Sequence, residues 1–301
     1  MPADEIINER EFPPSFMNSK AKAESERSET KQFLIHLARA FSGAILFSFP
    51  LLMTMEMWEL GAYMNGSRLA LFILLTVPLL VGLSYYDGFE ATSSVTDDAV
   101  DTFVAYAVGF ASSIVMLFLF GVIKPEMSAD EIIGKISLQS VIASFGAMFA
   151  QSLLLGDKQE KEESENRQRS ASYFGELFLM AVGAVFLSMS VAPTEEMNLI
   201  SYRMTDWHTI ALAVVTLLLM HAFVYAVEFS GHEKAISPDK SFLSVFLRFT
   251  VVGYAIVLLI SFYILWTFGS LDDMAFAEKL KTTIVLGFPA AIGASASRLI
   301  L

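Results

Sequence analysis

Long, uninterrupted apolar runs constrain this chain more than any other feature of its sequence. A helix needs roughly 20 consecutive apolar residues to cross the hydrocarbon core of a bilayer. Lipid cannot satisfy free backbone groups, so only helices and closed β-barrels cross it. The runs are continuously apolar, with no period-two alternation, and therefore predict helices. Eight segments qualify: Gln32–Met57, Arg68–Tyr86, Ala99–Ile123, Ile132–Leu155, Ala171–Ala192, Thr209–Phe229, Phe242–Phe268 and Ala275–Leu301.

Composition agrees with a membrane protein and excludes several other classes. Hydrophobic residues make up 54% of the 301 residues and charged residues only 17%, whereas soluble domains are about 45–50% apolar. The absence of cysteine excludes disulfides, thiolate metal sites and a cysteine nucleophile. The net charge of −12 argues against nucleic acid as a partner, because nucleic-acid binding needs a basic face.

The predicted fold class is all-α, a polytopic transmembrane helical bundle of about eight spans arranged as two parallel four-helix repeats. Residues 1–31 are polar and predict a largely disordered cytoplasmic tail. Residues 32–156 form the first transmembrane repeat and residues 171–301 the second. The charged stretch 157–170 contains no apolar residue and predicts a cytoplasmic linker between the repeats.

The evidence for a repeat is an internal similarity at an offset of 140 residues. This offset aligns the first predicted span with the fifth and the second with the sixth, and an offset of 144 aligns the fourth with the eighth. The third and seventh spans match poorly. Four helices per repeat return the chain to the side where it began, which makes the duplication parallel, with its axis along the membrane normal. The identical pairs in the first and fifth spans are Gly43/Gly183, Ala44/Ala184, Ser48/Ser188, Thr54/Thr194, Glu56/Glu196 and Met57/Met197.

Lysine and arginine predict the orientation, because they are enriched in cytoplasmic loops. The side that holds the N-terminal tail, the central linker, the loop between the sixth and seventh spans and the C-terminus carries twelve of them, against four on the other side. Both termini are therefore expected in the cytoplasm and the protein in the cell inner (plasma) membrane. Trp58, Trp207 and Trp266 fall at the outer ends of predicted spans, where an aromatic belt is expected.

The run Pro50–Trp58 (PLLMTMEMW) is the most distinctive stretch. It resembles the Pro-Leu-Leu-x-Thr-Met-Glu-x-Trp signature of a prokaryotic integral membrane protein family, a domain of unknown function. The resemblance extends to the eight-helix layout and so covers most of the chain after residue 31. It implies a fold and a location in the membrane, and it brings no mechanism.

The same run predicts part of an ion pathway. Pro50 lies inside a predicted span, where it removes a backbone donor and favours a kink. Glu56 recurs as Glu196, so the two acids could form a cation-attracting ring about the repeat axis; the alternative is that both are simply hydrated at the headgroup level. Acids at the inner ends of the second and sixth spans form either an inner vestibule or solvated helix ends. The predicted pathway residues are Glu56, Glu196, Thr54, Thr194, Ser48, Ser188, Asp87 and Glu228.

A second group of ionisable residues lies within or beside predicted spans: His36, Arg39, Glu176, Asp101 and Arg248. Such groups are expensive in lipid and usually face a partner or a water-filled cavity. The sequence predicts intramembrane pairs Arg39–Glu176 and Arg248–Asp101, with side chains that reach to the interface or a proton relay as the alternatives.

Enzyme signatures are absent from the sequence: there is no GxxxxGK[ST], HExxH, GxSxG or GxGxxG. No cofactor and no metal site are predicted.

The leading hypothesis is passage of a small inorganic ion, a cation, through an ion channel or secondary transporter at the repeat interface. The rival hypothesis is a non-transporting scaffold or sensor that binds a cytoplasmic partner. Small residues in the last span allow close helix packing, either at the seam between repeats or in a homo-oligomer.

Overall fold

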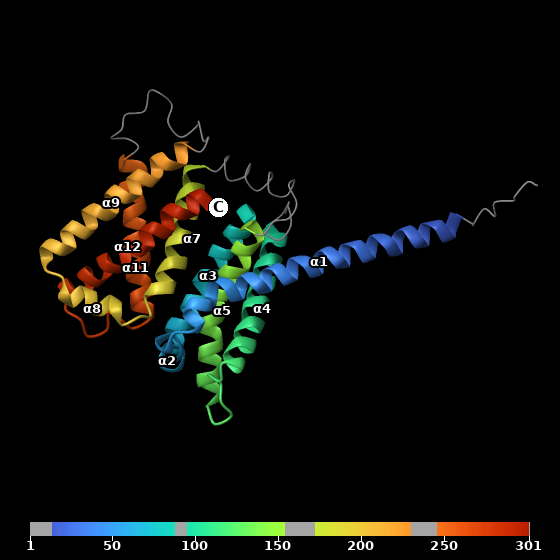
Figure 1. The fold of residues 1–301 in the computed structure, drawn as a ribbon, viewed down its shortest axis with the longest axis horizontal. Coiled ribbons are helices and arrows are strands. Elements are labelled where there is room, and N and C mark those ends of the chain that lie inside the picture. The colour runs from blue at the N-terminus through green and yellow to red at the C-terminus, as the bar shows by residue number, and fades with distance from the viewer. Residues whose placement is uncertain (1–13, 88–94, 154–171, 230–245, 301) are drawn as a thin grey trace, which may run out of the picture. The chain divides into compact units, whose positions relative to one another are not determined.

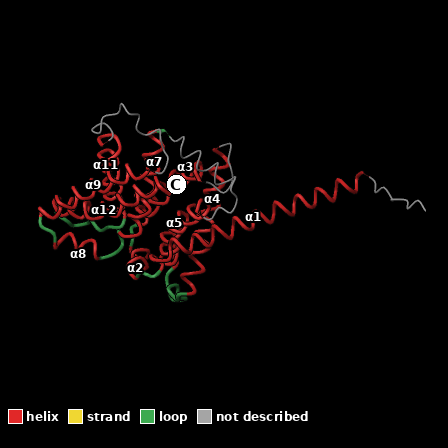
Figure 2. The backbone as a smooth tube through the Cα atoms, turned by 45° about the horizontal axis from the view of Figure 1, so that its top comes forward, coloured by secondary structure: helices red, strands yellow, loops and turns green. Residues whose placement is uncertain are grey.

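The computed structural model describes residues 14–87, 95–153, 172–229 and 246–300. Every regular element in these ranges is a helix (Figure 2), as the sequence predicted. The predicted linker 157–170 lies outside the described residues. The chain divides into two compact units, Met1–Ala38 and Arg39–Leu301, and the description below concerns the second.

Helix α1 (Pro14–Leu52) contains the boundary between the two units. It begins inside the tail for which the sequence predicted disorder. Two features explain the helix: a proline is well tolerated in a first turn, and Ala, Glu, Lys and Arg, which are frequent after it, have high helix propensity.

The helices of the second unit fall into two sets of similar order and length (Figure 1). The first set continues from α1 with α2 (Met55–Tyr63), α3 (Gly66–Asp87), α4 (Val95–Leu119) and α5 (Ala129–Leu153). The second set consists of α7 (Tyr173–Val191), α8 (Glu196–Arg203), α9 (Asp206–Phe229), the π-helix η1 (Phe246–Val251), α11 (Val252–Thr267) and α12 (Phe276–Ile300). We call them the first half and the second half.

Seven helices in the described part are long and apolar enough to cross a membrane, where the sequence predicted about eight spans. The difference lies in α12, which forms over the predicted eighth segment but is not among the seven. Its first turns carry Glu278, Lys279 and Lys281, and its second half is rich in glycine, alanine and serine, so its hydropathy is lower.

Each half contains a short helix that follows a break in a long one. Helix α1 ends at Leu52 and α2 starts three residues later; α7 ends at Val191 and α8 starts five residues later. Both breaks have a nearby proline, Pro50 and Pro193, which cannot donate a helical hydrogen bond. The predicted kink at Pro50 is thus a full interruption of the helix.

Several polar groups at the breaks are bonded internally. The backbone N–H and hydroxyl of Thr54 both donate to the Leu51 carbonyl, at 3.1 and 3.0 Å. Thr194 donates the same two bonds to Val191, at 3.1 and 2.9 Å. In the first half, the indole Nε1–H of Trp58 also donates to the Leu52 carbonyl at 2.8 Å. Carbonyls freed at a helix end need such partners.

Close glycine contacts join the long helices. A Cβ on Gly43 of α1 would lie 2.6 Å from the Gly146 carbonyl oxygen of α5. A Cβ on Gly183 of α7 would lie 2.2 Å from the Gly293 oxygen of α12. Small residues let membrane helices approach until their backbones touch, so these two contacts fix the separation of the central helices in each half.

Replacing Gly183 with alanine is expected to destabilise the protein although alanine favours helix, because the new methyl group would meet the α12 backbone. Overpacking of this kind costs about 1–3 kcal/mol, which should lower the midpoint of thermal unfolding in detergent. Gly66→Ala is the matched control, since nothing lies within 4 Å of its Cβ position. Equal midpoints for the two variants would contradict the close approach of α7 and α12.

Replacing Trp58 with phenylalanine removes the donor to Leu52 and keeps an aromatic ring. We expect a loss of about 1 kcal/mol, the usual net value of one hydrogen bond, seen as a lower unfolding midpoint. Trp207→Phe makes the same chemical change at a side chain that is 80% exposed and should have little effect. If both changes have the same effect, the indole does not stabilise the break.

Candidate functional site

The predicted outer acids lie at the starts of the two short helices. Glu56 is in the first turn of α2 and partly exposed, and Glu196 opens α8 and is exposed. The adjacent hydroxyls of Thr54 and Thr194 donate to backbone carbonyls. A hydroxyl that donates can still accept or ligate through its oxygen, so these residues stay candidates for the pathway, with a structural task in addition.

The paired serines one turn inside the breaks are both buried. Ser48 donates to the Ala44 carbonyl at 2.5 Å, which is the common way to satisfy a hydroxyl in a membrane helix. The Ser188 hydroxyl has no hydrogen-bond partner among the described residues. The side chains of Asp87 and Glu228, predicted at the inner ends, lie outside the described part of the structure.

The predicted intramembrane charges have varied surroundings. The Arg248 guanidinium lies 5.2 Å from the centre of the Tyr173 ring, and the Arg248 carbonyl accepts the Tyr173 hydroxyl at 2.8 Å. One terminal nitrogen of Arg39 is buried without a hydrogen-bond partner in the described residues. His36 belongs to the first unit. The pairs Arg39–Glu176 and Arg248–Asp101 stay predictions.

A buried acidic site lies between α3 and α4. Ser84 of α3 places its hydroxyl oxygen 3.4 Å from Asp98 and 3.2 Å from Asp101, both on α4. The Asp98 residue is only 4% exposed and Ser84 is fully buried. Thr102, one turn after Asp98, is also fully buried and donates to the Asp98 carbonyl at 2.9 Å.

The position of these acids has a partial local explanation. Asp97 and Asp98 lie in the first turn of α4, where the helix dipole favours negative charge. That effect needs no burial, and Asp97 is exposed. Asp98 instead faces α3, because residues 98, 101 and 102 lie on one side of a helix of 3.6 residues per turn. Helix geometry therefore turns two carboxylates toward one serine.

The chemistry of this site is that of oxygen ligands. A serine hydroxyl has a single proton and can donate to one carboxylate at a time. Carboxylate and hydroxyl oxygens are the ligands that hard cations prefer, and carboxylates also take up protons. Sequence reasoning singled out Asp101 but missed Asp98 and Ser84. The signal was the spacing Asp98-x-x-Asp101-Thr102 at the start of an otherwise apolar segment.

The second half carries a different polar group, between α9 and η1. An offset of 148 residues aligns α4 with η1 and α11, and it pairs Thr102 with the fully buried Thr250. His221 of α9 makes a 2.9 Å hydrogen bond between its Nδ1 and the Thr250 hydroxyl. The residues at the positions of Asp98 and Asp101 are Phe246 and Phe249. The identical pairs at this offset are Thr102/Thr250, Val104/Val252, Tyr106/Tyr254, Ala107/Ala255, Ser113/Ser261, Leu117/Leu265, Phe120/Phe268 and Gly121/Gly269.

Aromatic rings make several of the described contacts between the two halves. Phe186 of α7 packs edge-on against Phe47 of α1 and Phe149 of α5, with ring centroids 6.0 and 4.9 Å apart. Tyr86 at the end of α3 stacks on Phe178 of α7 at 6.2 Å. These apolar contacts give the seam no polar lining where they occur.

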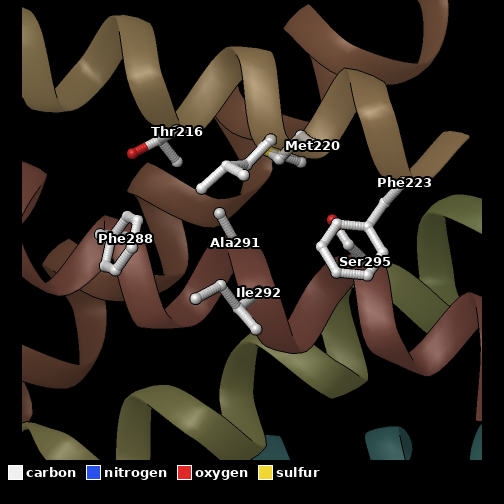
Figure 3. Close-up of a pocket in the computed structure, with 8 residues that line it drawn as sticks. Thr216, Met220, Phe223, Phe288, Ala291, Ile292 and Ser295 are labelled. Atoms are coloured by element: carbon white, nitrogen blue, oxygen red, sulfur yellow. The ribbon is translucent and has the colours of Figure 1, made fainter.

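A small pocket lies between α9 and α12, with about 170 Å³ of empty volume that includes open solvent (Figure 3). Its lining is largely apolar and includes Met220 and Phe223 from α9 and Phe288 and Ile292 from α12. Thr216 and Ser295 contribute the hydroxyls, and Thr216 uses its own to donate to Leu212 at 2.7 Å. The lining contains no charged residue, so it does not resemble an ion site.

Only one of the three tryptophans is highly exposed. Trp207 is 80% exposed at the start of α9, as a residue of an interfacial belt would be. Trp58 and Trp266 are partly buried and make specific contacts, the first with Leu52 and the second with Arg68. The prediction of an aromatic belt therefore fits Trp207 best.

The comparison with protein families agrees with the apolar helices. Residues 36–301 match the model of the family described as "Putative integral membrane protein (DUF2391)". No curated protein and no solved structure matches the chain. The match covers most of the chain and includes the Pro50–Trp58 run, on which the resemblance to a family of unknown function was based. The chain belongs to the DUF2391 family of integral membrane proteins.

Proposed function

We propose that this protein transports a small inorganic cation across the cell inner membrane and that Asp98 and Asp101 bind the cation. The observation that carries the proposal is the buried carboxylate of Asp98, 4% exposed within a helix that is long and apolar enough to cross a membrane. Acids inside spans are costly and commonly mark ion or proton pathways.

A secondary transporter fits these observations better than a channel. The rings of Phe47, Phe149 and Phe186 pack together where α1, α5 and α7 meet, which does not favour an open pore at that point in this conformation. A transporter needs no continuous pore, because it exposes one site to each side in turn. The proposed binding site therefore lies within the first half and not at the interface between the halves. Glu56 and Glu196 remain candidates for the outer mouth.

We infer that the two halves are parallel repeats. Three alignments support this: α2 and α3 correspond to α8 and α9 at offset 140, α4 corresponds to η1 and α11 at 148, and α5 to α12 at 147. The offset 147 pairs Gly146 with Gly293, the two glycines in the close contacts, and replaces the predicted 144. Gly121 and Gly269, paired at offset 148, both have a positive φ, +66° and +77°.

The orientation with both termini in the cytoplasm requires α12 to cross the membrane as an eighth span. Its contacts support this. Thr282 near the start of α12 donates to Ser201 of α8 at 3.0 Å. Ser297 near the end of α12 donates to the carbonyl of Leu179, which lies in the N-terminal part of α7, at 2.8 Å. Helix α12 thus runs antiparallel to α7, itself a candidate span, along most of its length. Because much of α12 packs against other helices, it can cross the membrane with a lower mean hydropathy than a helix that faces lipid.

A scaffold or sensor is the second candidate, and the ring-filled seam favours it. Apolar packing between the halves is what a rigid, non-transporting bundle needs. This candidate predicts that the acids near Ser84 affect stability alone and that purified protein carries no ion.

The test is flux in proteoliposomes that hold purified protein, with K⁺, Na⁺, Ca²⁺, H⁺ and Cl⁻ screened in turn. Asp98→Asn should reduce the flux of one cation by about tenfold or more, because a hydrogen bond or ligand contact to a charged group is worth roughly 1.5–3 kcal/mol. Asp97→Asn is the matched control, since it removes a neighbouring carboxylate that is exposed.

The double change Glu56→Gln with Glu196→Gln tests the outer mouth separately and should slow cation flux with less effect on binding. Folding is checked by size-exclusion chromatography and thermal unfolding. Absence of flux for every ion from folded, inserted protein would sink the transport proposal and favour the scaffold.

A further inference from the structure

Arg68 joins the two halves through a single group of contacts at the start of α3. Its guanidinium makes a two-pronged ion pair with Asp272, with Nη1–Oδ2 and Nη2–Oδ1 distances of 2.8 and 3.0 Å. Nη1 also donates to the Trp266 carbonyl at 3.0 Å, and the guanidinium carbon lies 4.9 Å from the centre of a Trp266 ring. Paired parallel bonds of this kind are specific to arginine.

The receiving segment is the connection between α11 and α12, and its backbone is shaped for this contact. Gly269 has a φ of +77°, which favours glycine, and its Cβ position lies 3.4 Å from the Asp272 carboxylate and 3.7 Å from Arg68. One turn after Arg68, Phe72 packs edge-on against Phe268 with centroids 5.8 Å apart. The contact therefore has an ionic part near the surface and an aromatic part beneath it.

The opposite end of α3 contacts the second half differently. There Tyr86 stacks on Phe178, and a Cβ on Gly82 would lie 2.4 Å from the same Phe178 ring. One helix thus meets the second half through an exposed ion pair above a single ring contact at its start, and through ring contacts without an ion pair at its end. Exposed ion pairs are weak and easily exchanged for water, whereas apolar contacts resist separation.

We propose that Arg68 and Asp272 form a reversible latch between the halves, which opens at this end while the Tyr86–Phe178 contact acts as the pivot. The repeat-related positions carry no equivalent ion pair. At the positions that correspond to Arg68 and Asp272 stand His208 and Lys124, which cannot form an ion pair of opposite charges. The His208 ring makes a 2.7 Å hydrogen bond with Thr205.

The charges around the latch keep Asp272 ionised at neutral pH, so the ion pair with Arg68 is present there. The pKa of Asp272 is lowered from its ordinary value of 3.8, first by the hydrogen bond from Arg68 and also by the positive charges of Arg68 and Lys279. A lowered carboxyl pKa means that the contact is present above the ordinary value and is lost as pH falls through the lowered one. Asp273 is the neighbouring acid in the same connection. At neutral pH the latch opens through movement of the halves and not through titration.

Distances between spin labels test the latch without any transport measurement. The chain has no cysteine, so labels attach only at introduced sites. Tyr63→Cys in the first half and Trp207→Cys in the second replace side chains that are 84% and 80% exposed. The labelled parent should give one narrow distance distribution at neutral pH. Asp272→Asn should broaden it and add a longer distance.

The matched control is Asp273→Asn, which removes the adjacent charge at a residue with φ of 59°, a conformation that asparagine tolerates. It should leave the distribution as in the parent. The exchange Arg68→Asp with Asp272→Arg should restore most of the narrow distribution, and Arg68→Lys, which keeps the charge and loses the fork, should broaden it partially.

Identical distributions for the parent, Asp272→Asn and Arg68→Lys would overturn the latch. If Asp272→Asn does not fold, the comparison of Arg68→Lys with Asp273→Asn decides. Because the readout is a distance, it stands whether or not flux is found, so failure of the latch and failure of the transport proposal are distinguishable.

Discussion

Hydrocarbon offers no hydrogen bonds, and this constraint accounts for the polar contacts at the two helix breaks. In water a broken helix can leave its last carbonyls to solvent, but inside a bilayer they need a partner from the protein. Both helix breaks meet this need with a threonine that returns two bonds to the carbonyl three residues earlier. The first break adds the Trp58 indole. Short helices can therefore follow long ones while the carbonyls of Leu51, Leu52 and Val191 keep hydrogen-bond donors.

The same constraint explains why helix packing relies on small residues. Lipid tails are as apolar as leucine, so membrane helices gain little from hiding apolar side chains from lipid and more from close backbone contact. The approaches of Gly43 to Gly146 and of Gly183 to Gly293 supply that contact in each half. With the central helices fixed in this way, the few remaining polar side chains stand out, and the acidic site of Ser84, Asp98 and Asp101 is the least expected among them.

The sequence predicted the helical class and the membrane location because both depend on the length and composition of apolar runs. It predicted the break near Pro50 only as a kink, since a proline shows where a helix loses a bond but not how the chain continues. It placed Asp101 in a span but missed Asp98, because burial of a residue in a first turn depends on the neighbouring helix. The similarity between α4 and α11 is not detected at offsets of 140 and 144. It appears at an offset of 148, which follows from the bounds of the helices. The contact of Arg68 with Asp272, 204 residues away, has no local signal at all.

The acidic site and the tie between the halves combine into one physical picture of transport. In the proposed mechanism, the buried Asp98 and the partly buried Asp101 of the first half offer oxygen ligands to a cation, and the second half supplies the surface against which the first moves. In the same proposal, the aromatic rings between the halves keep the path closed in this conformation, and access to the site depends on relative movement of the halves.

The most direct test of a cation site in the membrane is labelling of its carboxylates with dicyclohexylcarbodiimide, which is soluble in lipid, followed by peptide mass spectrometry. The proposed site predicts an adduct on the peptide that contains Asp98 and Asp101, and it predicts that one of the cations K⁺, Na⁺ or Ca²⁺ reduces this labelling in proportion to its concentration. Absence of an adduct on that peptide, or labelling that none of these cations changes, would contradict the assignment of the acidic pair as the binding site.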